Sequence, residues 1–329
     1  MLHIHNGDSS ANIAKASSIP GEHIAFRESL ITGPTPADVS GDEWRRVRAQ
    51  HLSESYPADL DECEQDLLNQ EKKLDSAAEY DEVVLWFEHD LFCQTNLLYL
   101  LNWFGQRELG NTKLRLICIG EFPGKENFRG LGELNAGEMA SLFPDRQSIT
   151  AAQLKLGELT WQAYCSPNPA EIKKVLDSDT SPLPFLDSAF RAHLRRFPST
   201  QNGLGRIEDT SLKLIRAGAK TFIELFPLFA NAEPVYGLGD SQLWLALNQL
   251  TAGKQPLLAI ENRHDVRQQL TPDIARKAKI EITKSGESVR RGEADQVELN
   301  GIDHWLGGVH LSPTNLWRWD DEIEALVSE

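Results

Sequence analysis

The sequence predicts an α/β fold: an N-terminal domain on a parallel, Rossmann-like sheet, followed by a C-terminal helical module that is winged-helix-like and α+β. Three observations lead to this prediction. Apolar runs alternate with helical segments in the first 125 residues, and each run is continuously apolar. Continuous runs are typical of strands covered on both faces, and the strand–helix–strand order is that of right-handed parallel crossovers. Each run also ends in a compact polar cluster.

The expected elements of the first half follow one another along the chain. Strands are predicted at residues 2–6, 23–26, 83–87 and 113–119, with helices at 9–17, from Asp59 onward, and at 91–104. Ser9 or Ser10 is expected to cap the first helix, because a hydroxyl can accept hydrogen bonds from the free N–H groups of a helix start. The connection at 34–80 is charged and mostly helical, and a connection of this length can contribute a lid over a site.

The second half is predicted to be a separate unit. A polar, proline-containing stretch at 177–184 is the best candidate for a linker, which divides the chain into domains at 1–176 and 184–329. Helices are predicted at 184–197, 207–218, 220–231 and 240–252, and strands at 257–260, 280–283 and 305–311, with Ser285-Gly286 separating the last two. Helices followed by a small sheet with a hairpin indicate the winged-helix-like module. Gly307-Gly308 permit close approach of another backbone.

Composition narrows the classes of partner. The 329 residues carry a formal net charge of −16, which argues against a protein that grips the phosphates of nucleic acid. The four cysteines are widely spaced without a CxxC pair, which argues against a structural zinc site and a disulfide framework. No apolar stretch approaches the length of a membrane span, and no secretory signal opens the chain. We therefore expect a cytoplasmic protein without a membrane partner, and the oligomeric state stays open.

Polar clusters stand where the expected parallel strands end. They are Asn6-Gly7-Asp8-Ser9-Ser10, Arg27-Glu28-Ser29, Glu88-His89-Asp90 and Glu121-Phe122-Pro123-Gly124. The carboxyl ends of parallel strands share one edge of a sheet, where open α/β sheets bind ligands. The predicted catalytic residues are Asp8, Glu28, Glu88, His89 and Asp90, and the predicted ligand-binding residues are Gly7, Ser9, Arg27 and Gln94. Gln94 follows Asp90 by four residues on the same helix face, whereas Asn96 falls on a different face.

Several of these motifs resemble a known family. The stretches HIHNGDSSA, RESLITGP and VVLWFEHDLFCQTNLLYLL are similar to the bacterial domain-of-unknown-function 1835 family, and GLGDSQLW, ITKSGESVRRGEADQ and NGIDHWLGGVHL to the region that follows this domain in longer members. The resemblance covers most of the chain and implies no catalytic role. The positions that match the family pattern are Asp8, Arg27, Glu28, Gly33, Pro34, Glu88, Asp90 and Gln94.

The Gly7-Asp8-Ser9 turn admits three interpretations. It is similar to the nucleophile motif of lipase-type serine hydrolases, although no D-x-x-H partner follows it. It can also be an ordinary strand-to-helix turn, in which Gly7 supplies backbone freedom and Asp8 or Ser9 caps the helix. In the third interpretation, the free N–H groups of the helix bind an anion such as a phosphate, and Arg27 clamps that anion through two hydrogen bonds.

Glu88-His89-Asp90 is the densest titratable cluster. Three such residues after a buried strand can shift one another's pKa and suit acid–base chemistry, and the carboxylates can bind a divalent cation. The structural alternative is that Asp90 caps the next helix while Glu88 pairs with Arg27. His3 and His5 share one face of a strand and could complete a metal site with Asp8 and Asp90, or simply pack in the core. Neither a metal nor a cofactor can be identified from the sequence.

Two functions fit these observations. The first is an enzyme, a hydrolase or transferase, that acts on a small phosphorylated or nucleotide-like ligand at the sheet edge. The second is a ligand-sensing regulator whose C-terminal module contacts DNA or a partner protein. The helix expected near 241–250 carries no Arg or Lys, which disfavours DNA reading. Basic residues that could contact phosphates lie nearby, at Arg195, Arg196, Arg206, Lys213 and Arg216.

Overall fold

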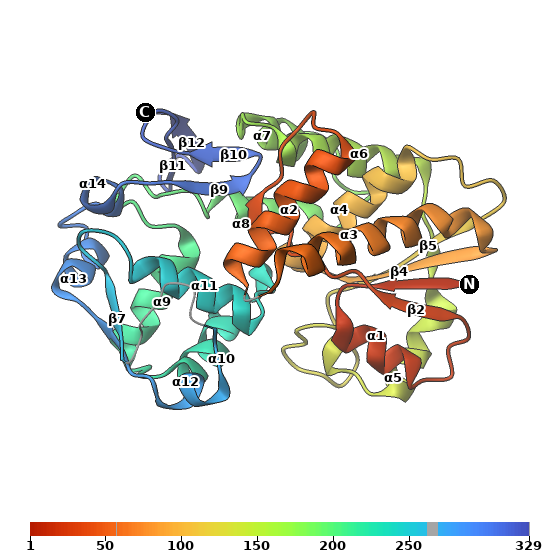
Figure 1. Ribbon diagram of the computed structural model, residues 1–329, viewed down its shortest axis with the longest axis horizontal. Helices are drawn as coiled ribbons and strands as arrows, with labels where there is room; N and C mark the ends of the chain where they lie inside the picture. Colours follow the sequence, from red (N-terminus) through yellow and green to blue (C-terminus); the bar gives the residue numbers. More distant parts are fainter. Residues whose placement is uncertain (57, 262–268, 329) are drawn as a thin grey trace.

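The computed structural model describes residues 1–56, 58–261 and 269–328. A five-stranded sheet in the order β2–β1–β4–β5–β6 lies at its centre (Figure 1). Four strands run parallel: β1 (Leu2–His5), β2 (Glu22–Ala25), β4 (Glu82–Glu88) and β5 (Lys113–Ile119). The fifth strand, β6 (Gln147–Ser148), is antiparallel to β5. The predicted α/β class and the mostly parallel sheet are confirmed.

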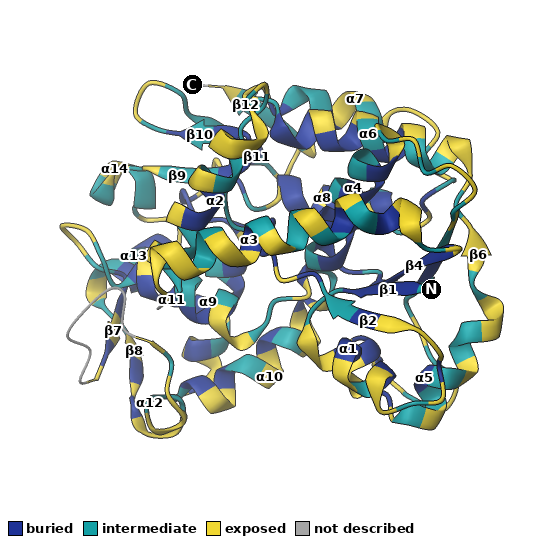
Figure 2. Cartoon of the chain, turned by 45° about the vertical axis from the view of Figure 1, so that its right-hand side comes forward, coloured by how far each residue is buried: buried dark blue, intermediate teal, exposed yellow. Residues whose placement is uncertain are grey.

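Hydrophobic cores cover both faces of this sheet, as the continuously apolar strands predict. Every residue of β1 and β4 is buried, and Figure 2 shows both strands inside the molecule. Val83 and Leu85 of β4 belong to the larger core, which includes residues of α4 and α6, whereas Val84 and Trp86 belong to a smaller core with α1 and α5. These helices are α1 (Asp8–Lys15), α4 (Leu91–Gly105), α5 (Ala136–Leu142) and α6 (Ala151–Cys165).

The long connection between β2 and β4 folds into two helices that pack on each other. They are α2 (Gly41–Ser55) and α3 (Leu60–Asp75), followed by the 3-10 helix η1 (Ser76–Glu79). Ser40 and Asp59 cap the two helices through side-chain hydrogen bonds to backbone N–H groups, which explains where each helix begins. Arg48 of α2 and Leu74 of α3 are buried, so this connection is part of the packed fold.

The four helices predicted for the second half are present. They are α8 (Leu186–Leu194), α9 (Arg206–Ala217), α10 (Phe222–Ala232) and α11 (Asp240–Leu250). The remaining elements are η2 (Leu131–Glu133), η3 (Phe143–Asp145), α7 (Ala170–Leu176), η4 (Pro234–Tyr236), β7 (Leu258–Ile260), α12 (Pro272–Lys277), β8 (Ile280–Ile282), α13 (Lys284–Arg290), α14 (Gln296–Asn300), β9 (His304–Gly307), β10 (Val309–Leu311), β11 (Trp317–Asp320) and β12 (Ala325–Ser328).

Two details of the predicted C-terminal module are corrected. Ser285-Gly286 lie inside α13, where the Thr283 side chain caps the helix start, and they form no turn between strands. The predicted strand at 305–311 is divided at Gly307-Gly308 into the hairpin β9–β10. The small antiparallel pairs β7–β8 and β11–β12 are compatible with a winged-helix-like module, which the structure does not confirm.

The C-terminal hairpin joins the first half of the chain directly. β9 pairs in parallel with the short strand β3 (Gly33–Pro34), which makes a three-stranded sheet in the order β10–β9–β3. Gly308 donates its N–H to the Tyr164 carbonyl oxygen at 2.8 Å, and a Cβ on Gly308 would lie 1.8 Å from the Cys165 carbonyl oxygen. The predicted close approach of another backbone at these glycines is confirmed, and the division into domains stays a prediction.

Within the described residues, no helix is both long enough and apolar enough to cross a membrane.

Candidate functional site

The first polar cluster begins α1. Gly7 is the N-cap, with φ of 99°, and no side chain caps this helix. The predicted capping role of Ser9 or Ser10 is therefore wrong: Ser10 lies inside the helix and donates its hydroxyl to the Gly7 carbonyl oxygen at 3.4 Å. Ser9 lies against the loop that follows β5, because a Cβ on Gly132 would approach its Oγ at 2.9 Å.

Asp8 and Arg27 form an ion pair at the surface. Arg27 Nε donates to Asp8 Oδ2 at 2.9 Å and Arg27 Nη2 to Asp8 Oδ1 at 2.7 Å, with side chains that are 63% and 53% exposed. The hydrogen bonds from Arg27 lower the pKa of Asp8. In the anion-binding interpretation, the Arg27 guanidinium would hold the anion, but in the structure it holds the Asp8 carboxylate. The predicted alternative, in which Arg27 pairs with Glu88, is wrong.

Glu28 makes a buried ion pair with Arg48 of α2. Arg48 Nε donates to Glu28 Oε1 and Arg48 Nη2 to Glu28 Oε2, each at 2.8 Å, and the two side chains are 0% and 4% exposed. Arg48 Nη1 also donates to the carbonyl oxygens of Thr32 at 2.8 Å and Pro34 at 3.1 Å. The pair therefore holds the 28–34 loop against α2. The predicted catalytic role of Glu28 stays a prediction.

Glu88, Asp90 and Cys93 form a buried cluster at the end of β4. Their ligand atoms all lie within 4.8 Å of one another, and no other group of this kind occurs in the described part of the chain. Cys93 Sγ donates to Glu88 Oε2 at 2.5 Å, and the Leu131 N–H donates to Glu88 Oε1 at 2.7 Å. Burial, together with the negative charge of Asp90, raises the pKa of Glu88 to about 7.

Asp90 itself is the N-cap of α4 and accepts a hydrogen bond from the Cys93 N–H at 2.9 Å, so the structural alternative for this residue is confirmed. Burial raises the pKa of Asp90. Its carboxylate also lies against Gly237, since a Cβ there would stand 2.0 Å from Asp90 Oδ1. His89 points elsewhere: its ring packs edge-on against Phe185 with ring centroids 6.0 Å apart, outside the Glu88–Asp90–Cys93 cluster.

Two amides of α4 tie the strand ends together. Gln94 Nε2 donates to the Glu88 carbonyl oxygen at 2.7 Å, so Gln94 does point toward the predicted edge. Asn96 Nδ2 donates to Asn6 Oδ1 at 2.8 Å and to the Glu28 carbonyl oxygen at 2.9 Å. The expectation that Asn96 is unrelated to the site is wrong. The missed signal was its spacing of three residues from Cys93, which places both on one side of the helix.

His3 and His5 are packed core residues rather than metal ligands. His3 Nε2 lies 3.1 Å from the Pro20 carbonyl oxygen, and His3 Nδ1 accepts a hydrogen bond from Trp86 Nε1 at 3.1 Å. His5 Nε2 lies 3.1 Å from His23 Nδ1. Burial lowers the pKa of His3 to about 4 and that of His5 to about 2. These imidazoles are neutral and separate from Asp8 and Asp90.

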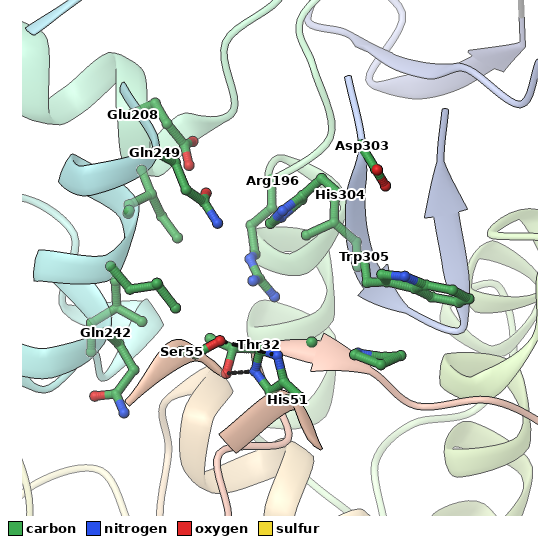
Figure 3. Close-up of a pocket in the computed structure, with 17 residues that line it drawn as sticks. Thr32, His51, Ser55, Arg196, Glu208, Gln242, Gln249, Asp303, His304 and Trp305 are labelled. Carbon is green, nitrogen blue, oxygen red and sulfur yellow. Dashed lines mark hydrogen bonds between the residues drawn. The ribbon is translucent and has the colours of Figure 1, made fainter. Parts of the chain in front are cut away.

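A cavity of about 190 Å³ lies beside this edge, between the loop after β2 and the second half of the chain. Figure 3 shows Arg196 in its middle, with His304 and Trp305 to one side and Glu208, Gln242 and Gln249 to the other. Thr32, His51 and Ser55 form its floor in that view. The sequence did not predict that these residues meet, because they come from segments far apart along the chain.

His51 and Ser55 stand one turn apart on α2. His51 Nδ1 lies 3.2 Å from Ser55 Oγ, and His51 Nε2 lies 3.1 Å from Thr32 Oγ1. Burial, with a smaller effect of the Arg48 charge, lowers the pKa of His51 to about 3, so its ring is neutral at pH 7. A neutral imidazole between two hydroxyls accepts a hydrogen bond from one and donates a hydrogen bond to the other. This is the hydrogen-bonding pattern of a base beside a hydroxyl nucleophile.

The His51 ring packs directly against Gly33, which leaves no room for a side chain at residue 33. The φ of Gly33 is +72°, and a Cβ would lie 2.3 Å from His51 Cγ and Cδ2. We predict that Gly33→Ala displaces the ring and lowers the free energy of unfolding by about 1–3 kcal/mol, through backbone strain and overpacking. Urea unfolding and the NMR shifts of the His51 ring would measure both effects. Gly41→Ala is the matched control, because a Cβ there meets nothing within 4 Å.

Arg196 is the cation of the cavity. Its Nη2 donates to the Ile31 carbonyl oxygen at 2.7 Å, and its Nη1 donates to His193 Nδ1 at 3.4 Å. Among the described residues, no carboxylate oxygen lies within 4.0 Å of its guanidinium, and its Nε has no hydrogen-bond partner. A guanidinium held by neutral groups inside a cavity can bind an anion.

The cavity and the predicted edge are neighbouring parts of one region. Gln242 of α11 lines the cavity and donates its Nε2 to Tyr56 Oη at 3.3 Å and to Ser29 Oγ at 3.5 Å. Ser29 follows Glu28 in the second polar cluster. The segment that places Gly237 against Asp90 continues into Leu238 on the cavity wall. The 237–242 segment therefore spans from the Glu88–Asp90–Cys93 cluster to the cavity.

No protein-family model and no curated protein matches this chain. The resemblance to the domain-of-unknown-function 1835 family stays a prediction.

Proposed function

We propose that this chain is an enzyme, a hydrolase or transferase, that acts on a small phosphorylated ligand bound in the cavity around Arg196. One observation carries the proposal: the Arg196 guanidinium lies in a cavity with no carboxylate within 4.0 Å among the described residues. A partly buried guanidinium without an anionic partner is favourable when a ligand supplies the anion, and phosphate offers oxygens for paired N–H donors. Arg27, by contrast, is already paired with Asp8.

The residues around Arg196 support phosphoryl transfer. Ser55 Oγ would attack phosphorus, its proton would pass to His51 Nδ1, and the bond from phosphorus to the leaving oxygen would break. His51 would return that proton to the leaving oxygen, and water or an acceptor would then take the phosphoryl group from Ser55. Thr32, bonded to His51 Nε2, would fix the tautomer of the ring. The bound anion would raise the pKa of His51, because a negative charge favours the imidazolium.

The position of α11 supports the enzyme over the regulator. Leu243, Trp244 and Leu247 of this helix are buried, while Gln242 and Gln249 line the cavity. A recognition helix must present one side to the DNA groove. In α11, one side packs in the core and another lines the cavity. The ligand-sensing regulator is the second candidate function. Residues of both halves of the chain line the cavity, so a ligand bound there would contact both halves. Ligand binding without turnover would favour it.

The proposed function is tested with small phosphate esters and matched variants. A phosphate ester at a free concentration of 100 times its Kd adds about 2.7 kcal/mol to the free energy of unfolding. We expect this stabilisation in the wild type and in Arg195→Gln, whose side chain is outside this cavity, but not in Arg196→Gln. Ser55→Ala and His51→Gln should bind the ester and lose at least 100-fold in phosphate release. Equal stabilisation of Arg196→Gln, or no stabilisation of the wild type, would contradict the proposal.

A further inference from the structure

Glu208 brings a second charge to the wall of the cavity. It lies in the first turn of α9 and lines the cavity beside Gln249 (Figure 3). Among the residues that the structure describes, no cationic nitrogen lies within 4.0 Å of its carboxylate. Burial raises the pKa of this carboxyl, which means that its charged form is poorly solvated where it stands. A donor from a ligand would offset that loss of solvation.

The backbone holds Glu208 and Arg196 near each other without pairing them. A Cβ on Gly205 would lie 2.5 Å from the Arg196 carbonyl oxygen and 2.6 Å from Glu208 Oε2. Gly205 therefore packs between the backbone of Arg196 and the carboxylate of Glu208, where a larger residue would not fit. The Arg206 N–H also donates to the Arg195 carbonyl oxygen at 2.9 Å. Despite this proximity the guanidinium and the carboxylate form no ion pair in the described structure. The charge of Arg196 partly offsets the effect of burial on the pKa of Glu208, but among the described residues neither group has an ion-pair partner within 4.0 Å.

The volume limits what can lie between these groups. An apolar cavity of about 150 Å³ holds one benzene molecule. At about 190 Å³, the cavity holds roughly eight non-hydrogen atoms by the same measure. That is the size of a short-chain phosphate ester.

We propose that the ligand of this cavity is a small zwitterion whose phosphate binds Arg196 and whose ammonium group binds Glu208. The inference rests on the proposed function and names the substrate class: short amino-alkyl phosphates. The neutral amides of Gln242 and Gln249 line the same walls, where an amide N–H would donate to a phosphate oxygen and an amide oxygen would accept from the ammonium group.

Calorimetric titration with two probes tests this inference. The probes are 2-aminoethyl phosphate and 2-hydroxyethyl phosphate, which differ only in the ammonium or hydroxyl end. For the wild type we expect the amine to bind at least tenfold more tightly. In Glu208→Gln this preference should shrink to less than twofold, while the hydroxyl probe keeps its affinity within about threefold. Arg196→Gln should lose both probes.

The outcomes separate the two proposals. Equal affinities of the wild type for both probes, or an amine preference that survives in Glu208→Gln, would overturn the zwitterion and leave the phosphate site standing. If the wild type binds neither probe, the proposed function fails and the inference fails with it. The wild-type comparison needs no variant, so a folding defect in Glu208→Gln would not hide the answer.

Discussion

Arg48→Met is expected to lower the free energy of unfolding by about 3–5 kcal/mol, because it leaves the Glu28 carboxylate buried without its cation. Arg48 is fully buried and bonds both oxygens of Glu28. Its removal also takes one hydrogen-bond donor from each of the carbonyl oxygens of Ser29, Thr32 and Pro34. Urea unfolding followed by circular dichroism measures the loss as a fall in the midpoint.

Two comparisons make this result specific. Arg46→Met removes an exposed arginine from the same helix and should change stability by less than about 0.5 kcal/mol. The double variant Glu28→Leu with Arg48→Met removes the charge pair entirely and should recover part of the loss, although not all, since the loop carbonyls still lack the hydrogen bonds from Arg48. A loss below about 1 kcal/mol in Arg48→Met would show that the loop does not depend on this pair. A loosened loop should also weaken phosphate binding, because Thr32 and Gly33 line the cavity.

The elements of this fold follow from local patterns, so the sequence predicts them well. Residues 83–87 of β4 form an unbroken apolar run, and a run buried on both faces has few alternatives to a central strand. Asp59 and Asp90 cap their helices as polar residues before apolar stretches generally do. Ser9 and Ser10 misled the prediction because Gly7, with positive φ, is the N-cap, two residues earlier than a Ser9 cap would require.

The cavity could not be predicted because it depends on pairings between distant segments. β3 has two residues and pairs with β9, more than 250 residues further along the chain. Nothing local marks such a short strand. Arg196 was visible only as one of several basic residues of the second half, and charge in a sequence does not tell which side chain turns inward. The contrast between Arg27, paired at the surface, and Arg196, unpaired in a cavity, appears only in three dimensions.

Glu88→Gln is expected to be more stable than the wild type at pH 8 and to lose that advantage as the pH falls. Folding raises the pKa of Glu88 from 4.5 to about 7, so the carboxyl stabilises the fold below pH 4.5, and this contribution is lost as the pH rises through 7. At about 1.4 kcal/mol for each unit of pKa, the difference between variant and wild type should change by about 3 kcal/mol between pH 4.5 and pH 8. Gln can still accept from the Leu131 N–H.

The histidines make this comparison necessary, since they act with the opposite sign in the same range. Folding lowers the pKa of His3 and His304 to about 4 and that of His51 to about 3, so these groups destabilise the fold as the pH falls below 6.5. In the wild type, Glu88 offsets part of that fall, whereas Glu88→Gln should show the histidine slope undiminished. Urea unfolding from pH 4.5 to pH 8 measures both slopes. Glu126→Gln, which removes an exposed carboxylate, is the matched control. A pH-independent difference between Glu88→Gln and the wild type would mean that the Glu88 carboxyl titrates alike in the folded and unfolded chains, and that its burial beside Asp90 leaves its proton affinity unchanged.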